Sequence, residues 1–365
     1  NNYGEAKFIV SSSAANGTHT TIAAAITAAS SGDTIFIRDG TYTENLTLKA
    51  GVNLTSFLGD GYAGTVIILG NATATGAGTF CVSGVQLKTN SANCLTVSGS
   101  SATVVYLDNV FVNCSNNTGI SYTTSNASAS LSAVNCTFDL GTTGIAYYSM
   151  SSTGTFNSFR SNFLNSGAST TASSNSAGSV GFFQCAVTAP VSTSSAGVMA
   201  GFNSIINTQA QNATCITTAG TGITHGWSNG SLLSGSASSV SVGSGTTLTL
   251  LNAAISSTNT NAVTGAGTLQ YAGVTFGAAS VKINTTTQVG GTIEGGVTQA
   301  PSAGFLGEQI SSAATSVATT STTPKSITSI SLTAGVWDIS AIATSVATGG
   351  TALISTQILG ISATD

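Results

Sequence analysis

Residues 20–54, TTIAAAITAASSGDTIFIRDGTYTENLTLKAGVNL, decide the fold of this chain because they place one short helix before a series of short strands. The threonine pair at the start provides a helix N-cap, and apolar residues then follow at the i, i+3, i+4 and i+7 positions of an amphipathic helix. Gly32 is a suitable left-handed stop. After it, alternating apolar residues such as Ile35 and Ile37 predict short strands separated by tight glycine turns.

This order of elements resembles the N-terminal cap and first coils of the pectin-lyase-like family. The resemblance rests on three runs, residues 21–26, 32–37 and 40–45. It implies an all-β fold, a right-handed parallel β-helix (solenoid) with a short N-terminal capping helix and a small C-terminal β segment. Because that fold carries lyases, esterases, hydrolases and inert fibres alike, the resemblance predicts the architecture and leaves the activity open.

A five-residue strand recurs between residues 83 and 276 at spacings of 19 to 26 residues. Its nine copies begin at Ser83, Asn109, Asn135, Ser161, Gln184, Asn203, Asn229, Asn252 and Ala272. A period of this length without helices is typical of a β-helix with two or three short strands in each coil. Asparagine begins five of the copies, so we expect a ladder of stacked asparagines that tolerate left-handed turns, with a structural role.

The sequence divides into four parts. Residues 1–60 are predicted to form the cap and first coils, 61–300 the β-helix, 301–325 a Ser-, Ala- and Thr-rich linker, and 326–365 a C-terminal β segment. The run ITSISLTAGVWDI at 327–339 resembles the start of a C-terminal β-sandwich module of bacteriophage tail-fibre and other virion structural proteins. Since the chain given stops at Asp365, we expect an incomplete sandwich that a longer chain or partner chains complete.

Composition narrows the classes of partner. Only 5% of the residues are charged, the net charge is −4, and the seven basic residues are scattered, so nucleic-acid binding is not expected. No apolar run approaches the ~18 residues of a membrane helix, so membrane insertion is not expected either. The two histidines and six cysteines show no metal-ligand spacing, which predicts free buried thiols, no metal and no cofactor.

Acidic residues are too few for an obvious active site. None occurs between Asp139 and Glu294, whereas glycoside hydrolysis normally uses two carboxyl groups roughly 5–9.5 Å apart. If the protein is an enzyme, Asp108 and Asp139 are the catalytic candidates. They occupy different slots of the repeat, so we expect them to point to different faces as turn or surface residues.

Aromatic residues provide the candidates for ligand binding. Trp227 with His225, and Tyr147 with Tyr148, are adjacent or nearly so in the sequence and could form platforms on which sugars stack. The alternative for all four is a place in the β-helix core, where aromatic side chains are common.

The cap, the coil period and the scarcity of acidic residues, together with what the resemblance of residues 327–339 implies, favour a structural and adhesive virion fibre protein, a phage tail fibre or tailspike-like receptor-binding appendage that recognises cell-surface glycans. It would be a homotrimer that contacts other virion proteins and host cell-surface polysaccharide, and an enzymatic role is not the first expectation. Two alternatives stay open. One is a polysaccharide depolymerase, glycosidase or lyase, on the same fold; the other is a secreted or cell-surface bacterial adhesin.

Overall fold

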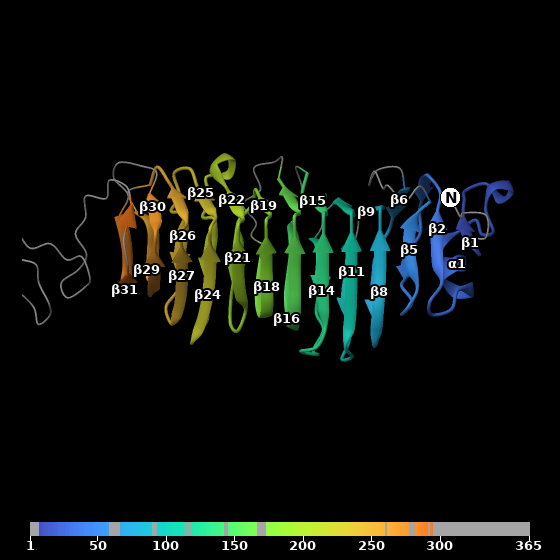
Figure 1. Ribbon diagram of the computed structural model, residues 1–365, viewed down its shortest axis with the longest axis horizontal. Helices are drawn as coiled ribbons and strands as arrows, with labels where there is room; N and C mark the ends of the chain where they lie inside the picture. Colours follow the sequence, from blue (N-terminus) through green and yellow to red (C-terminus); the bar gives the residue numbers. More distant parts are fainter. Residues whose placement is uncertain are drawn as a thin grey trace, which may run out of the picture. The chain divides into compact units, whose positions relative to one another are not determined.

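The chain forms a parallel β-helix, in which short strands wind in successive coils and every neighbouring pair of strands is parallel (Figure 1). The computed structural model describes residues 7–57, 66–89, 93–113, 115, 118–141, 145–165, 173–259, 261–276, 282–290 and 293–294. The predicted parallel β-helix with its short N-terminal capping helix is confirmed. The predicted linker (301–325) and C-terminal segment (326–365) lie outside the described residues.

The N-terminal cap contains the helix α1 (Ile22–Ala28) that the sequence predicts. Thr21 is its N-cap, and its hydroxyl accepts a hydrogen bond from the backbone N–H of Ala24 at 3.3 Å. The Glu44 carboxylate, one coil later, accepts the free N–H groups of Ile22 (2.8 Å) and Ala23 (2.9 Å). A negative charge at a helix N-terminus is favourable, so the second coil of the chain caps the helix of the first.

Each coil contributes strands to three faces. The first face contains β4 (Leu46–Thr47), β7 (Ala72–Thr75), β10 (Leu95–Ser98), β13 (Thr118–Tyr122), β20 (Val191–Thr193), β23 (Ile216–Thr218) and β26 (Val240–Val242). The second contains β1 (Phe8–Val10), β2 (Thr34–Ile37), β5 (Asn53–Ser56), β8 (Gly78–Ser83), β11 (Thr103–Asp108), β14 (Ser130–Val134), β21 (Val198–Phe202), β24 (Ile223–Ser228) and β27 (Thr246–Leu251). Four longer strands, β16 (Ala146–Phe159), β18 (Ser173–Phe183), β29 (Asn261–Ala272) and β31 (Lys282–Gly290), run through both faces.

The third face is a separate sheet formed by the predicted repeat. Its strands are β3 (Gly40–Tyr42), β6 (Val66–Leu69), β9 (Gln86–Lys88), β12 (Phe111–Asn113), β15 (Thr137–Asp139), β17 (Asn162–Leu164), β19 (Ala186–Val187), β22 (Ile205–Asn207), β25 (Ser231–Leu233), β28 (Ala254–Ser256), β30 (Val274–Phe276) and β32 (Ile293–Glu294). Two short 3-10 helices, Ala14–Asn16 and Gln209–Gln211, complete the described elements.

A sharp corner joins the second face to the third, and in nine coils one residue at this corner has a left-handed backbone. We call these residues the corner ladder: Gly84, Asn109, Asn135, Arg160, Gln184, Asn203, Asn229, Asn252 and Gly273, with φ between 47° and 65°. All five predicted asparagines belong to it, as expected for a residue that tolerates this conformation. The predicted register was wrong by one residue in three copies, where Gly84, Arg160 and Gly273 replace the expected Ser83, Ser161 and Ala272.

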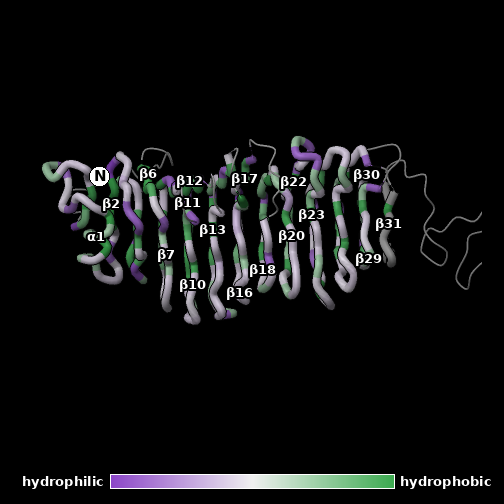
Figure 2. Tube along the Cα trace, turned by 180° about the vertical axis from the view of Figure 1, so that it is seen from behind, coloured by the Kyte–Doolittle hydropathy of each residue, from purple (hydrophilic) through white to green (hydrophobic). Residues whose placement is uncertain are grey.

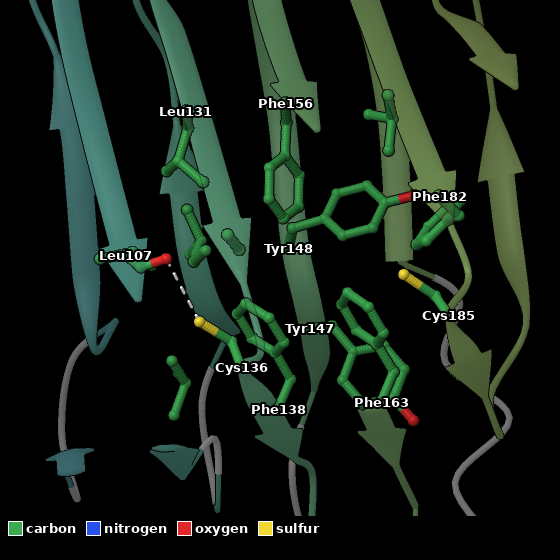
Figure 3. Packing of buried hydrophobic residues seen from close by; sticks show 14 of the residues in the cluster. Leu107, Leu131, Cys136, Phe138, Tyr147, Tyr148, Phe156, Phe163, Phe182 and Cys185 are labelled. Carbon is green, nitrogen blue, oxygen red and sulfur yellow. Dashed lines mark hydrogen bonds between the residues drawn. The ribbon is translucent and has the colours of Figure 1, made fainter. Parts of the chain in front are cut away.

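The core is a stack of apolar layers, one layer for each coil. Apolar residues recur along the strands, as the hydropathy colouring in Figure 2 shows. Phe138 and Phe163 from successive coils stack with ring centroids 4.6 Å apart and planes 6° apart. Tyr147 and Phe182 each form an edge-to-face pair with Phe163, with ring centroids 5.2 and 5.5 Å apart (Figure 3). These interlocked rings hold the coils from β15 to β18 in register.

Candidate functional site

The two carboxylates proposed as catalytic candidates lie on different faces. Asp108 ends β11 on the second face, and Asp139 ends β15 on the third. The Asp139 carboxylate accepts the N–H of Gly141 at 2.8 Å and so closes a turn, whereas Asp108 accepts a long hydrogen bond (3.5 Å) from the Asn135 amide. The two carboxyl groups therefore do not face each other across a common surface, as the pair in a glycosidase does.

The carboxylates of the N-terminal coils have structural partners. Asp33 accepts the N–H of Ser30 at 2.7 Å and pairs with Lys7 at 3.2 Å, and these two contacts lower its pKa. Glu44 caps α1. Across the residues that the structure describes, no group of three His, Cys, Asp or Glu side chains is placed to hold a metal ion.

The four aromatic candidates for a sugar platform point into the core. Trp227, His225, Tyr147 and Tyr148 are each at most 1% exposed, so none of them presents an open ring face on which a sugar could stack. The Trp227 indole fits inside because Gly201, its register partner in the preceding coil, has no side chain: a Cβ there would lie 2.2 Å from the indole. The expectation of ligand contact is therefore not supported for these residues, which instead follow the core alternative.

His225 is an unusual member of that core. It occupies an inward position of β24, in register with Leu248. Its Nδ1 accepts the N–H of Met199 at 3.3 Å, while Nε2 is buried without a hydrogen-bond partner. Burial lowers the pKa of the imidazole, since the charged form would lose its hydration.

Charge is absent from a long part of the chain. Between Arg160 and Lys282 the sequence contains no Lys, Arg, Asp or Glu, and its one histidine, His225, is buried. At the N-terminal limit of this uncharged part, the Arg160 Nε donates to the Asn135 Oδ1 at 3.0 Å, and Asn135 in turn contacts Asp108. The described surface beyond Arg160 can therefore offer a ligand hydrogen bonds and apolar contacts, but no ion pairs up to Lys282.

A groove with a volume of about 610 Å³, which we call the corner groove, follows the corner ladder through this uncharged part. Its lining residues are Asn203, Ile205, Asn229, Gly230, Ser231, Asn252, Ala253, Ala254, Gly273 and Thr275. The amides of Asn229 and Asn252 are linked, with Nδ2 of Asn252 donating to Oδ1 of Asn229 at 3.3 Å. Beside these amides Ile205 is 45% exposed, so the groove combines amide groups with an apolar wall.

A second hollow, of about 200 Å³, lies on the outer side of the second face, and we call it the apolar slot. Its lining residues are Phe183, Ala200, Gly201, Phe202, Gly226, Trp227, Ser228, Thr249 and Leu251. Phe202 is 44% exposed and Leu251 43%, which is high for large apolar side chains. Gly226 faces outward, and a Cβ placed there would meet nothing within 4 Å.

The corner groove and the apolar slot flank the corner ladder. Phe202 directly precedes Asn203 in the chain, and Leu251 directly precedes Asn252. Exposed aromatic and aliphatic side chains beside neutral amides suit a ligand that has both apolar faces and hydroxyl groups. Sequence reasoning missed these residues, although a signal existed, because phenylalanine directly precedes three consecutive ladder positions: Arg160, Gln184 and Asn203.

Comparisons with known proteins identify no family. No family model and no curated protein matches the chain. The Agl-KA catalytic domain is similar, with a TM-score of 0.37 and 11% identity over 74% of this chain and 64% of that chain. The catalytic unit of a thermostable GH87 α-1,3-glucanase from Streptomyces thermodiastaticus strain HF3-3 has a TM-score of 0.39 and 15% identity over 76% of this chain and 65% of that chain. The AlgE4 A-module of a mannuronan C-5 epimerase from Azotobacter vinelandii has a TM-score of 0.35 and 13% identity over 80% of this chain and 96% of that chain.

The chain spans less than two thirds of the first two of these structures. Superpositions of this quality assign neither a family nor an activity to the chain. Separately, none of the helices in the described residues is long and apolar enough to cross a membrane.

Proposed function

We propose that this protein binds polysaccharide and has a structural and adhesive role. The observation that carries the proposal is the uncharged outer surface beyond Arg160, where exposed apolar side chains and a row of asparagine amides flank one corner of the β-helix. Sugars present hydroxyl groups at their rims and C–H groups on their faces, and this surface offers partners for both.

We further propose the biological setting that the sequence favours. The resemblance of residues 327–339 to a virion module supports a phage tail fibre or tailspike-like appendage on the outside of the virion, a homotrimer that binds host cell-surface polysaccharide. A secreted or surface-anchored bacterial adhesin would use the same surface. Multi-angle light scattering tests the trimer: a mass three times that of the chain supports it, and a monomer at micromolar concentration contradicts it.

A polysaccharide depolymerase is the second candidate, and one contact favours it. Asp108 and Arg160 are joined through Asn135, so a carboxylate and a guanidinium lie at the same corner that the groove follows further along. In a cleaving enzyme Asp108 would act as general acid or base, and Arg160 would bind a negative charge of the polymer or of the transition state.

One experiment separates the two candidates. The protein is incubated with a panel of bacterial capsular and lipopolysaccharide preparations, and both binding, by affinity electrophoresis, and release of reducing ends are measured. Binding without cleavage supports the adhesive role. Cleavage that Asp108→Asn reduces by two orders of magnitude or more supports the depolymerase. If no polymer is bound or cleaved, the proposal of polysaccharide binding fails.

A further inference from the structure

We infer that the apolar slot binds sugar rings of an uncharged polysaccharide that runs along the axis of the β-helix. The inference rests on the proposed function, polysaccharide binding, and adds to it the place on the molecule, the class of polymer and its direction. The slot lies on the second face, between the coils that carry β18 and β27.

The floor of the slot is flat because its outward residues are small. Ala200 and Gly226 line the slot as register partners in successive coils, and Gly181, their partner one coil earlier, lies beside the slot. With no side chain at Gly181, the Phe183 ring lies against the sheet, where a Cβ of residue 181 would be only 2.6 Å from it. Over Gly226 the space is empty. With only a methyl group at Ala200 and no side chain at Gly226, this part of the floor lets a flat ring approach the sheet closely.

Aromatic rings form one wall of the slot. Phe183 and Phe202 line the slot at the same register of successive coils, and outside the slot Phe183 stacks on Phe159 with ring centroids 4.8 Å apart and planes 13° apart. Leu251 occupies the same register two coils after Phe202, with Ser228 between them. The C–H face of a sugar stacks on such side chains, because the π-face of an aromatic ring carries negative charge that attracts polarised C–H groups.

Polar groups at the slot match the hydroxyl groups of a sugar. The Thr249 hydroxyl donates to Gln270 Oε1 at 3.1 Å on the exposed surface, and the Ser228 hydroxyl lies only 3.5 Å from the carbonyl of Gly201. Both hydroxyls retain lone pairs that can accept from a ligand. Since no ionised side chain occurs between Arg160 and Lys282, this wall and floor have no means to neutralise a uronate or sulfate group. The polymer is therefore uncharged.

The direction of the polymer follows from the repeat. Equivalent residues of successive coils are one strand spacing apart, about 4.8 Å, which is close to the length of one sugar residue in an extended chain. A polymer along the axis can therefore repeat similar contacts in successive coils. A second copy of the protein is a poorer occupant, because two partly exposed side chains, Phe202 and Leu251, offer little of the roughly 800 Å² per partner that a stable protein interface buries.

Three variants of the full chain test the inference. Gly226→Val fills the slot in open space, and valine suits a strand position whose φ is not left-handed. Phe202→Ala removes the most exposed ring of the wall, and Phe202→Tyr restores it. Ser132→Val is the matched control, because Ser132 is the register equivalent of Gly226 four coils earlier, outside the slot.

The probes are neutral polymers (dextran, yeast mannan and a galactan) and charged ones (alginate and heparin), in native affinity gels at low and high salt. We expect wild type, Ser132→Val and Phe202→Tyr to be retarded by a neutral polymer, with little effect of salt because no ion pairs are involved. Gly226→Val and Phe202→Ala should weaken binding about tenfold or more.

Different failures are distinguishable. If a neutral polymer retards all variants equally, the slot is not the binding site, although the protein still binds polysaccharide. If only alginate or heparin retards the protein, and salt relieves the retardation, the inference that the bound polysaccharide is uncharged is refuted. A change of oligomeric state in Gly226→Val, seen by light scattering, would show that a second copy covers the slot. If no polymer retards the wild type, both the slot and the proposed function are refuted.

Discussion

The corner ladder makes a quantitative prediction at Asn229. Its backbone has φ 51°, its side chain is exposed, and its Oδ1 accepts one hydrogen bond from Asn252 at 3.3 Å. An ordinary residue in the left-handed conformation costs roughly 1–2 kcal/mol, a cost that asparagine largely avoids and glycine does not incur. The exposed hydrogen bond adds about 0.5 kcal/mol.

These terms rank three substitutions of Asn229. We expect Asn229→Gly to lower the free energy of unfolding by about 1–1.5 kcal/mol, through the lost hydrogen bond and the larger conformational entropy of glycine in the unfolded chain. Asn229→Ala should lower it by about 1.5–2.5 kcal/mol, the sum of backbone strain and the lost hydrogen bond, and Asn229→Val by more than about 2.5 kcal/mol, because a β-branched side chain fits the left-handed region worst. Packing contributes little, because the side chain lies outside the core.

The assay is urea unfolding followed by the fluorescence of Trp227, which lies two residues away and is 1% exposed. The chain has only two tryptophans, so the series is made in a Trp337→Phe background. Because a solenoid can unfold in parts, the signal reports the coil that carries the substitution. If Asn229→Val is as stable as the parent, or if Gly is worse than Ala, the left-handed corner is not the reason for the asparagine ladder.

Three further predictions concern the core. Phe163→Ala should cost about 3–5 kcal/mol in urea unfolding, since the ring is fully buried and stacked on its neighbours; a cost under about 1 kcal/mol would contradict the packing in Figure 3. Burial lowers the pKa of His225 in the native state, so below about pH 6.5, the pKa of an unfolded histidine, the unfolded state binds more protons than the native state. The free energy of unfolding should therefore decrease as the pH is lowered from about 6.5, by at most about 1.4 kcal/mol per pH unit. His225→Leu should remove this dependence in thermal melts between pH 7 and 5, and an unchanged dependence would refute it. Burial raises the pKa values of the Cys94 and Cys136 thiols to about 12, so mass spectrometry should find neither alkylated by iodoacetamide in the native protein, whereas rapid native labelling would contradict their burial.

The sequence was sufficient for the fold because the fold depends on local patterns. The helix after Thr21 and the asparagines of the ladder are set by capping, periodicity and turn preference, all of which act within a few residues. The register errors at Ser83 and Ser161 arose where the ladder residue is glycine or arginine, which the asparagine pattern does not include. A predicted register that is correct to within one residue is enough to locate the coils, but a shift of one residue exchanges the inward and outward side chains of a strand.

The site could not be predicted for the same reason. Trp227 lies two residues after His225 in the sequence, and only its pairing with Gly201, 26 residues earlier, shows that the indole points inward. Conversely, Phe202 is an ordinary strand residue in the sequence, and its exposure follows from its outward position directly before the corner. Inward and outward positions alternate along a strand, so aromatic character alone did not separate them.

The most direct test of polysaccharide binding on the uncharged surface is a crystal structure of the protein with a bound neutral oligosaccharide. We expect sugar rings over Gly226, stacked on Phe202 and Phe183, with the chain along the β-helix axis. Sugar density on another face only, or a second copy of the chain seated in the apolar slot with no sugar there, would contradict this account.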